Sequence, residues 1–213
     1  MKGIATALLL LCSASVSAQP LQLPFNGRWF VMQGGDTPNV NQHMTVAAQA
    51  FGVDFAKVGG NLQRQLAPSN PTRNEDFFSW GEPVLAPAEG VVVSVENNQP
   101  DNSLGEKDAA HPAGNYVSIK LAEDRFVFVA HMQKGSVAVK PGDTVRRGQP
   151  LGLCGNSGNS DFPHVHLHMQ DTPILNQGRG LNPEFGPINV ELTGKQFSKV
   201  TWPLIRGLFV SNP

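Results

Sequence analysis

Three histidines recur at alternate positions in the last third of the chain, at His164, His166 and His168. Alternate side chains of an extended strand point to the same face, so this spacing places three imidazoles side by side. A neutral imidazole nitrogen is a good zinc ligand, and histidine exchanges protons near neutral pH. The pattern therefore predicts metal binding or proton transfer. A solvent-facing polar stripe would show the same alternation.

Further candidates lie upstream. His131 ends the apolar run 126–130, and the end of a strand is a place from which a side chain projects into a groove, although a single histidine there is also compatible with a surface position. Asp54 lies inside the apolar stretch 52–55, where a carboxylate is costly unless it is paired or bound to a metal. Its partner is then a metal or an arginine. His43 precedes it, whereas His111 stands in a polar loop and is expected to have no special role.

Short apolar runs separated by Gly, Pro, Asn and Asp must position these residues. Such runs are typical of strands, and no sustained helical period exceeds about ten residues. A short helix is predicted at 44–51, and turn residues occupy 89–90, 123–124 and 141–143. We therefore expect a mostly β, single-domain fold, a small antiparallel sheet or sandwich with a groove and long loops. The predicted strands are 29–32, 52–55, 84–86, 91–95, 116–121, 125–130, 150–153 and 165–169.

Two polar stretches, 61–82 and 97–114, read as long loops within this domain. They either wall a substrate groove or are variable surface loops. The turn 155–160 (GNSGNS) is flexible enough for its backbone amides to approach a ligand closely. From Glu191 onward the alternation is lost, so we expect a domain at 19–190 and a packed tail at 191–213.

The first eighteen residues have the composition of a secretory signal peptide. Lys2 is followed by the apolar run 4–11 and a small-residue cleavage site at Val16-Ser17-Ala18. A buried N-terminal element is the alternative, and Cys12 is a candidate lipoprotein site that large preceding leucines disfavour. We therefore expect export to the periplasm or the extracellular space. Cleavage leaves Cys154 without a disulfide partner, as a small buried packing residue rather than a nucleophile.

The composition excludes several classes of partner. The 213 residues include 16 Lys and Arg against 17 Asp and Glu, for a net charge of −1. Without a basic run, the chain is not expected to bind nucleic acid or an anionic membrane surface. No segment has the length of a transmembrane helix. We expect a monomer.

A series of short motifs carries a more specific signal. They are His43 with Asp54, 81–92 (GEPVLAPAEGVV), 114–117 (GNYV), 130–132 (AHM), 139–152 (VKPGDTVRRGQPLG), 155–158 (GNSG) and 163–166 (PHVH). Each is weak alone. In this order, across 43–169, the set resembles the lysostaphin-type zinc metalloendopeptidases.

The resemblance implies a small antiparallel sheet around a narrow groove and cleavage of peptide bonds in bacterial peptidoglycan. It implies one zinc ion held by His43, Asp54 and His166, with His131 and His164 as catalytic groups. Three protein ligands and an open position are typical of a catalytic zinc. The zinc would activate a water molecule, and the two histidines would share proton transfer and oxyanion stabilisation. Which histidine is the base stays open.

The chain departs from the family pattern at two positions. Ten residues separate His43 from Asp54 instead of the usual three, so an inserted loop or short helix must bring these ligands together. His168 stands where the family often has a carboxylate or an amide. It either orients a ligand or is a surface residue, and we slightly favour a surface position.

Parts of the sequence are compatible with two other functions. The hairpin 139–151 resembles half of a lipoyl or biotin carrier domain, but the chain lacks the Met-Lys-Met modification site that such domains use. A non-catalytic relative of the same fold, which binds peptidoglycan or activates another hydrolase, is the stronger alternative. Such relatives lose zinc ligands, whereas this chain offers candidates at all five positions. The sequence does not specify which peptide bond is cleaved or whose wall is the target.

Overall fold

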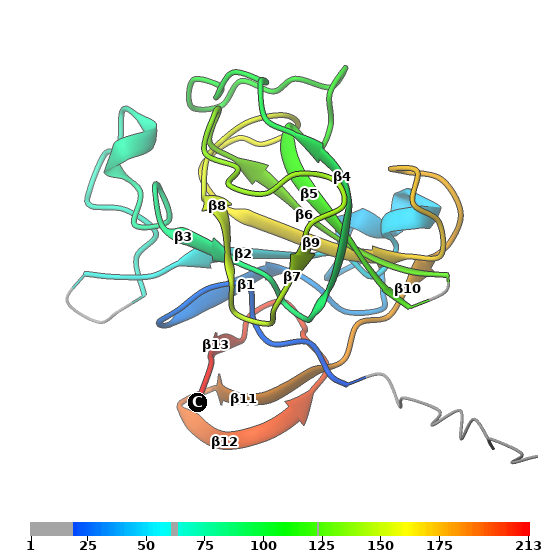
Figure 1. The fold of residues 1–213 in the computed structure, drawn as a ribbon. Helices are drawn as coiled ribbons and strands as arrows, with labels where there is room; N and C mark the ends of the chain where they lie inside the picture. The colour runs from blue at the N-terminus through cyan, green and yellow to red at the C-terminus, as the bar shows by residue number, and fades with distance from the viewer. Residues whose placement is uncertain (1–18, 61–63, 123) are drawn as a thin grey trace, which may run out of the picture.

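The computed structural model describes residues 19–60, 64–122 and 124–213. The predicted signal peptide at 1–18, with Cys12, lies outside the described residues. The described chain consists mainly of strands and long loops, with short 3-10 turns (Figure 1). The prediction of a mostly β, antiparallel, single-domain fold is confirmed.

The predicted apolar runs all form strands, with small shifts at the ends, whereas the short strand at Thr144–Val145 and the strands after residue 179 were not predicted. The 3-10 turns are η1 (Gln42–Thr45), η2 (Ala47–Gln49) and η3 (Asn74–Asp76). The strands are β1 (Trp29–Gln33), β2 (Val53–Lys57), β3 (Pro83–Leu85), β4 (Gly90–Glu96), β5 (Asn115–Ala122), β6 (Arg125–Met132), β7 (Thr144–Val145), β8 (Pro150–Leu153), β9 (Val165–Gln170), β10 (Gly180–Leu181), β11 (Phe185–Leu192), β12 (Lys195–Trp202) and β13 (Phe209–Ser211).

One large sheet organises the molecule. Its strand order is β12-β11-β13-β1-β2-β9-β6-β5-β4-β7, and β10 pairs with β9. Strands β3 and β8 form a separate pair. The ladders between the described strands are antiparallel. Strand β9, which carries the histidine alternation, therefore lies in the middle of the sheet between β2 and β6.

The register of these three strands separates core residues from polar ones. On one face, Leu167 of β9 lies opposite Val53 of β2 and Val129 of β6, and all three are buried in the core. On the other face, His166 lies opposite Asp54 and Ala130. Because side chains alternate along a strand, each core residue in this row sets the orientation of its polar neighbour.

The helix predicted at 44–51 is replaced by the two 3-10 turns η1 and η2. This region lacks a continuous apolar stripe, and in these two turns only Ala48 is buried. A stretch with so few buried side chains forms short 3-10 turns rather than a longer helix.

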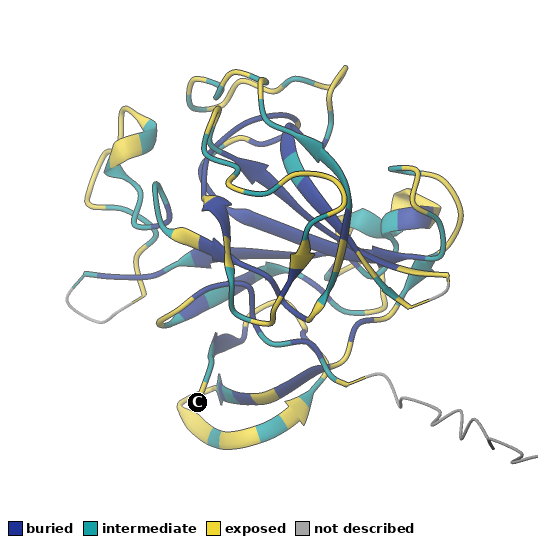
Figure 2. Ribbon diagram, viewed as in Figure 1, coloured by how far each residue is buried: buried dark blue, intermediate teal, exposed yellow. Residues whose placement is uncertain are grey.

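The residues after Glu191, predicted as a packed tail without strand-like alternation, form β12, the end of β11 and β13. The alternation of β12 is weak because the strand lies at the sheet edge and is largely exposed, as Figure 2 shows. Strand β13, by contrast, is inserted between β11 and β1. The C-terminal residues are thus part of the sheet.

Removal of residues 203–213 is therefore expected to unfold much of the chain. The deletion removes the buried side chains of Leu204, Leu208 and Val210, each of which contributes about 1.5–3 kcal/mol. It also leaves β1 and β11 without their common partner. This loss is comparable with a whole domain's stability of about 5–15 kcal/mol. Thermal unfolding followed by circular dichroism tests it, with removal of the exposed Pro213 alone as the control. An unchanged midpoint after the longer deletion would contradict the prediction.

Candidate metal and catalytic site

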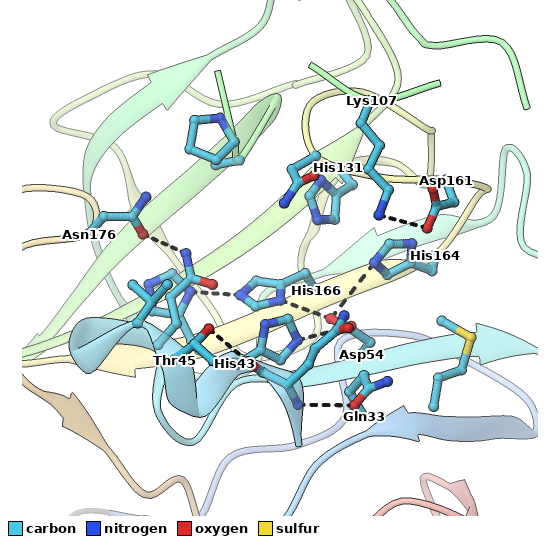
Figure 3. Close-up of a pocket in the computed structure, with 18 of the residues that line it drawn as sticks. Gln33, His43, Thr45, Asp54, Lys107, His131, Asp161, His164, His166 and Asn176 are labelled. Atoms are coloured by element: carbon cyan, nitrogen blue, oxygen red, sulfur yellow. Dashed lines mark hydrogen bonds and ion pairs between the residues drawn. The ribbon is translucent and has the colours of Figure 1, made fainter. Parts of the chain in front are cut away.

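A groove of about 530 Å³ lies over the polar face of β2, β9 and β6. Figure 3 shows side chains from these strands, from η1 and from the surrounding loops converging on it. The five residues predicted to bind metal or catalyse line this groove, and so does His168: His43, Asp54, His131, His164, His166 and His168.

Asp54 lies at the centre of the cluster. Its Oδ2 is 2.9 Å from Nε2 of His43, and its Oδ1 is 2.9 Å from Nδ1 of His166 (Figure 3). Nε2 of His164 lies 3.7 Å from the same Oδ1. Only 3% of Asp54 is exposed, so histidines, rather than the arginine considered as its alternative partner, surround this buried charge.

Three of these residues have the arrangement of a metal site. One ligand atom each from His43, Asp54 and His166 lies within 4.8 Å of the others. Although Nε2 of His43 is close to Asp54, it is buried and makes no hydrogen bond of acceptable geometry, one of two such side-chain atoms in the described part of the chain. An unpartnered buried nitrogen beside a carboxylate fits a cation-binding site, because a buried polar atom is otherwise costly.

Asn41 explains how His43 reaches Asp54 across ten residues. The Asn41 side chain caps η1 by accepting a hydrogen bond from the His43 amide at 3.1 Å. Its Nδ2 donates to the carbonyl oxygens of Gly35 at 2.8 Å and Gly52 at 3.1 Å. This buried amide therefore clamps both ends of the inserted segment. The predicted loop or short helix is present as η1 and η2.

Gly52 leaves room for this closure. A Cβ at Gly52 would lie 3.0 Å from Cε1 of His166 and 3.2 Å from Cδ2 of His43. The two imidazole rings pack edge to face, with centroids 4.6 Å apart. A side chain at this position would push them apart.

Backbone carbonyl groups orient His131 and His164. Nδ1 of His131 lies 2.8 Å from the Ser157 carbonyl oxygen, and Nδ1 of His164 lies 2.9 Å from the Phe162 carbonyl oxygen. A carbonyl oxygen only accepts, so Nδ1 of each ring carries the hydrogen. In the neutral rings, Nε2 is therefore a free acceptor. The two ring centroids are 4.7 Å apart.

A β-bulge turns His131 toward the groove. The β5–β6 register shifts between the pairs Tyr116–Ala130 and Asn115–Met132, so His131 is an extra residue. Its φ of 65° lies in the left-handed region. Since Ala130 faces the groove beside His166, regular alternation would direct His131 to the opposite face. The bulge re-aims this side chain, a common role for bulges beside active sites.

The turn 155–160 packs tightly beside this bulge. Gly114 has a φ of 56°, and a Cβ there would lie 2.4 Å from the carbonyl carbon of Ser157. Ser157 also donates its hydroxyl hydrogen to the Met132 carbonyl oxygen at 2.7 Å. The turn was expected to offer backbone amides to a ligand. Its observed contacts instead include a carbonyl oxygen that orients His131.

His168 is buried, so the favoured prediction of a surface position was wrong. Only 1% of it is exposed, because its ring stacks on Phe128 at a centroid distance of 4.9 Å in the middle of the sheet. Its Nδ1 lies 2.9 Å from Nε2 of His166, and its Nε2 lies 3.1 Å from Oε1 of Gln170. His168 thus contacts a candidate metal ligand directly.

The charges of the cluster set the pKa values of Asp54 and His43. Burial alone would raise the pKa of Asp54, but the charges of His43 and His164 and the close contact with His166 hold it well below its usual value. Burial lowers the pKa of His43, but the charge of Asp54 and its close contact with the ring together outweigh burial and raise that pKa overall. Asp54 is therefore a carboxylate at neutral pH.

Burial keeps the imidazoles of His131, His166 and His168 neutral. It lowers the pKa of His166 to about 4, with the charge of His43 acting in the same direction. Burial, followed by the charges of His164 and His166, lowers the pKa of His131 well below its usual value. Burial and His166 do the same for His168. Neutral rings can act as metal ligands and proton acceptors.

Loops form the rims of the groove. Lys107, Pro112 and Ala113 of the long loop 97–114 line it, and Lys107 forms a 2.9 Å ion pair with Asp161 across the rim. The described residues of loop 61–82 do not line the groove. They support it, because Phe77 stacks on the lining residue Phe162 at 5.4 Å.

Two other residues behave as the sequence suggested. His111 is exposed and pairs with Asp108 at 2.8 Å, outside the cluster. Cys154 is free and buried, and burial raises the pKa of its thiol well above the usual value, so it is a packing residue.

Sequence reasoning missed several residues that hold the site. Asn41 precedes a 3-10 turn, where an Asn N-cap is a recognisable signal. Gln170 continues the alternation of His166 and His168 by one step. Ser157 and Phe162 act through backbone carbonyl groups, for which the side chains give no signal.

Comparison with known families shows which family the chain belongs to. Residues 75–183 match the profile of Peptidase family M23. The chain belongs to this family. The motif-based resemblance is thereby confirmed. The matched segment of this M23 chain includes His131, His164 and His166 but begins after His43 and Asp54.

Several sequence relatives are named as peptidases. A protein of Haemophilus influenzae named as an uncharacterized metalloprotease is 31% identical over 185 residues, covering 79% of this chain and 31% of the relative. Peptidoglycan DD-endopeptidase ShyA of Vibrio cholerae is 36% identical over 123 residues, covering 57% of this chain and 23% of ShyA. The chain thus spans about a quarter to a third of the length of these relatives.

Among solved structures, the catalytic domain of a variant of the prophage-encoded M23 protein EnpA from Enterococcus faecalis aligns with a TM-score of 0.47 and 21% identity. The alignment covers 76% of this chain and 95% of that domain. In the described part of the M23 chain, no helix is long and apolar enough to cross a bilayer.

Replacement of Asn41 by Ala is expected to weaken metal binding, because three backbone carbonyl groups and the His43 amide lose their partner. The destabilisation should be about 1–3 kcal/mol. Asn212→Ala is the matched control, because Asn212 similarly bridges backbone groups of Leu23 and Phe25 at the C-terminal side of the sheet. Zinc affinity measured by chelator competition should fall in the first variant only. Equal affinities in both variants would disprove the clamp.

The stability of the metal-free protein is expected to decrease below about pH 6.5, the ordinary histidine pKa. The folded chain keeps His131, His166 and His168 neutral, whereas the unfolded chain protonates them, so unfolding takes up protons in acid. The raised pKa of His43 has the opposite effect, because it stabilises the folded protein below about pH 6.5. This is the effect of one histidine, whereas three histidines destabilise the folded protein in acid. Urea unfolding with a chelator should give a lower midpoint at about pH 5.5 than at about pH 7.5. A higher midpoint in acid would contradict this balance.

Proposed function

We propose that this protein is an exported, zinc-dependent endopeptidase that hydrolyses peptide bonds in bacterial peptidoglycan. One observation carries the proposal: the cluster of His43, Asp54 and His166 and the Nε2 acceptors of two further histidines line the same groove. Family M23 membership supports a peptidase.

His43, Asp54 and His166 would hold the metal. Two imidazoles and a carboxylate are the donor set of many catalytic zinc sites with three protein ligands. The unpartnered Nε2 of His43 beside the carboxylate of Asp54 fits such an ion. When bound, zinc supplies Lewis-acid polarisation of the scissile carbonyl and acidifies the attacking water.

His164 and His131 would move the protons. Nε2 of His164 is the acceptor beside Asp54, so it is placed to take a proton from the attacking water as oxygen bonds to the carbonyl carbon. His131 stands next to it, and whichever of the two rings holds that one proton would donate a hydrogen bond to the developing oxyanion. The C–N bond then breaks, and a histidine returns the proton to the leaving amine.

The substrate class and location rest on relatives and on the sequence. ShyA and ShyC of Vibrio cholerae are named peptidoglycan DD-endopeptidases. The predicted signal at 1–18 would deliver this protein to the compartment that contains peptidoglycan. Lys107 of loop 97–114 and Gln42 and Thr45 of η1 line the groove, so polar groups are available there to bind the backbone of a peptide.

The test measures metal content first and cleavage second. The purified protein should contain one zinc ion per chain by elemental mass spectrometry, and His166→Ala should contain none. The zinc-loaded protein should release new amino termini from crosslinked peptidoglycan, detected by liquid chromatography and mass spectrometry. His164→Gln should retain zinc and lose about 10²–10⁴-fold in kcat.

The outcomes separate the candidate functions. Zinc binding without cleavage of any crosslinked peptidoglycan would overturn the endopeptidase and favour a peptidoglycan-binding or hydrolase-activating module of the same fold. Absence of zinc after reconstitution would overturn the metal site itself.

A further inference from the structure

A hydrogen-bonded chain runs from a candidate metal ligand to the groove rim. Nε2 of His166 contacts Nδ1 of His168 at 2.9 Å, and Nε2 of His168 contacts Oε1 of Gln170 at 3.1 Å. Nε2 of Gln170 then reaches the carbonyl oxygens of Thr172 at 2.9 Å and Ile174 at 2.6 Å. His166, His168 and Gln170 are all buried in β9, with at most 4% of each exposed.

The loop end of this chain fixes its direction. Two carbonyl oxygens face one end of the Gln170 amide, so that end is the NH₂ group and Oε1 faces His168. Because Oε1 only accepts, Nε2 of His168 carries the hydrogen. Nδ1 of a neutral His168 then accepts, and the hydrogen between the two rings belongs to Nε2 of His166.

The same direction of hydrogen bonding determines whether the other ring nitrogen of His166, Nδ1, carries a hydrogen. With its hydrogen on Nε2, the neutral ring presents a lone pair at Nδ1, the atom that lies 2.9 Å from Oδ1 of Asp54. A lone pair facing a carboxylate oxygen is unfavourable unless a cation lies between or beside them. The hydrogen-bonded series through His168 and Gln170 therefore leaves Nδ1 of His166 free to bind a metal rather than to donate a hydrogen bond.

We propose that His168 and Gln170 are positioning residues that hold His166 in the Nε2–H tautomer and so assign Nδ1 to the metal. This inference rests on the metal site of the proposed function and deepens it. The backbone of loop 171–179 is the anchor of the chain, because its carbonyl oxygens orient the Gln170 amide.

The anchoring loop also forms part of the groove rim. Asn176, in this loop, lines the groove and accepts a hydrogen bond from Gln49 of η2 (Figure 3). Asp171 and Arg179 close the loop with a 3.1 Å ion pair. The orientation of the metal ligand and the conformation of this rim are therefore coupled through Gln170.

The decisive variants change the hydrogen bonds and preserve the shape. His168→Phe keeps a ring that can stack on Phe128 but has no nitrogen, so His166 and Gln170 lose their partner. His168→Gln restores one acceptor and one donor. Ile188→Ala, in the buried part of β11 and separated from β9 by three strands, controls for general destabilisation.

Zinc affinity by chelator competition is the first readout. We expect His168→Phe to bind zinc about 10- to 100-fold more weakly, the usual effect of losing a group that orients a ligand. His168→Gln should recover most of the affinity, and Ile188→Ala should bind as the parent protein does. Equal affinity in His168→Phe and the parent would overturn the proposal.

The tautomer of His166 is the second readout, measured by ¹⁵N NMR in the metal-free protein. The proposal requires that His166 carries its hydrogen on Nε2 before any metal binds. In His168→Phe, the ring of His166 should no longer be restricted to this one tautomer. A hydrogen on Nδ1 in the metal-free parent would overturn the proposal, even if the protein binds zinc. Failure of the parent to bind zinc would instead disprove the proposed function, while the tautomer measurement still decides the role of His168.

Discussion

The negative charge of Asp54, buried on β2, is the constraint on which the site depends. A carboxylate in this position is costly unless opposite charge or hydrogen bonds surround it. Its neighbours come from three separate segments: His43 from η1, His164 from the loop before β9 and His166 from β9. The carboxylate is therefore fully surrounded only when β2 is paired with β9 and the segment before β2 is closed over it.

Backbone carbonyl groups outside the cluster orient the histidines. Ser157 orients His131, Phe162 orients His164, and the carbonyl groups of Thr172 and Ile174 reach His166 through the proposed chain. In each case an oxygen that can only accept selects which ring nitrogen carries hydrogen. The loops around the groove thus determine the chemistry of side chains held on rigid strands.

The family match and the metal cluster cover different parts of the chain. The M23 profile begins at residue 75, whereas two of the three candidate ligands precede it. The segment that supplies His43 is held by Asn41 and by the small size of Gly52. A longer spacing between ligands is tolerated because a clamp of hydrogen bonds, rather than one short turn, fixes the geometry.

The sequence by itself determined the fold class and the polar face of β9. Alternating apolar and polar residues fix which side chains share a face, so Val165 and Leu167 predicted the orientation of His166. The ordered motifs indicated the family for the same reason: each is a local pattern. The position of Asp54 within an apolar strand predicted that its carboxylate has a charged or metal partner.

Only the tertiary structure decided which residues meet and how they are covered. The bulge that turns His131, the approach of His43 and the edge position of β12 depend on strand pairing between distant segments. The burial of His168 follows from the packing of both faces of β9, with Phe128 stacked on its ring. Local alternation specifies a face, but burial of that face depends on what the remaining chain places against it.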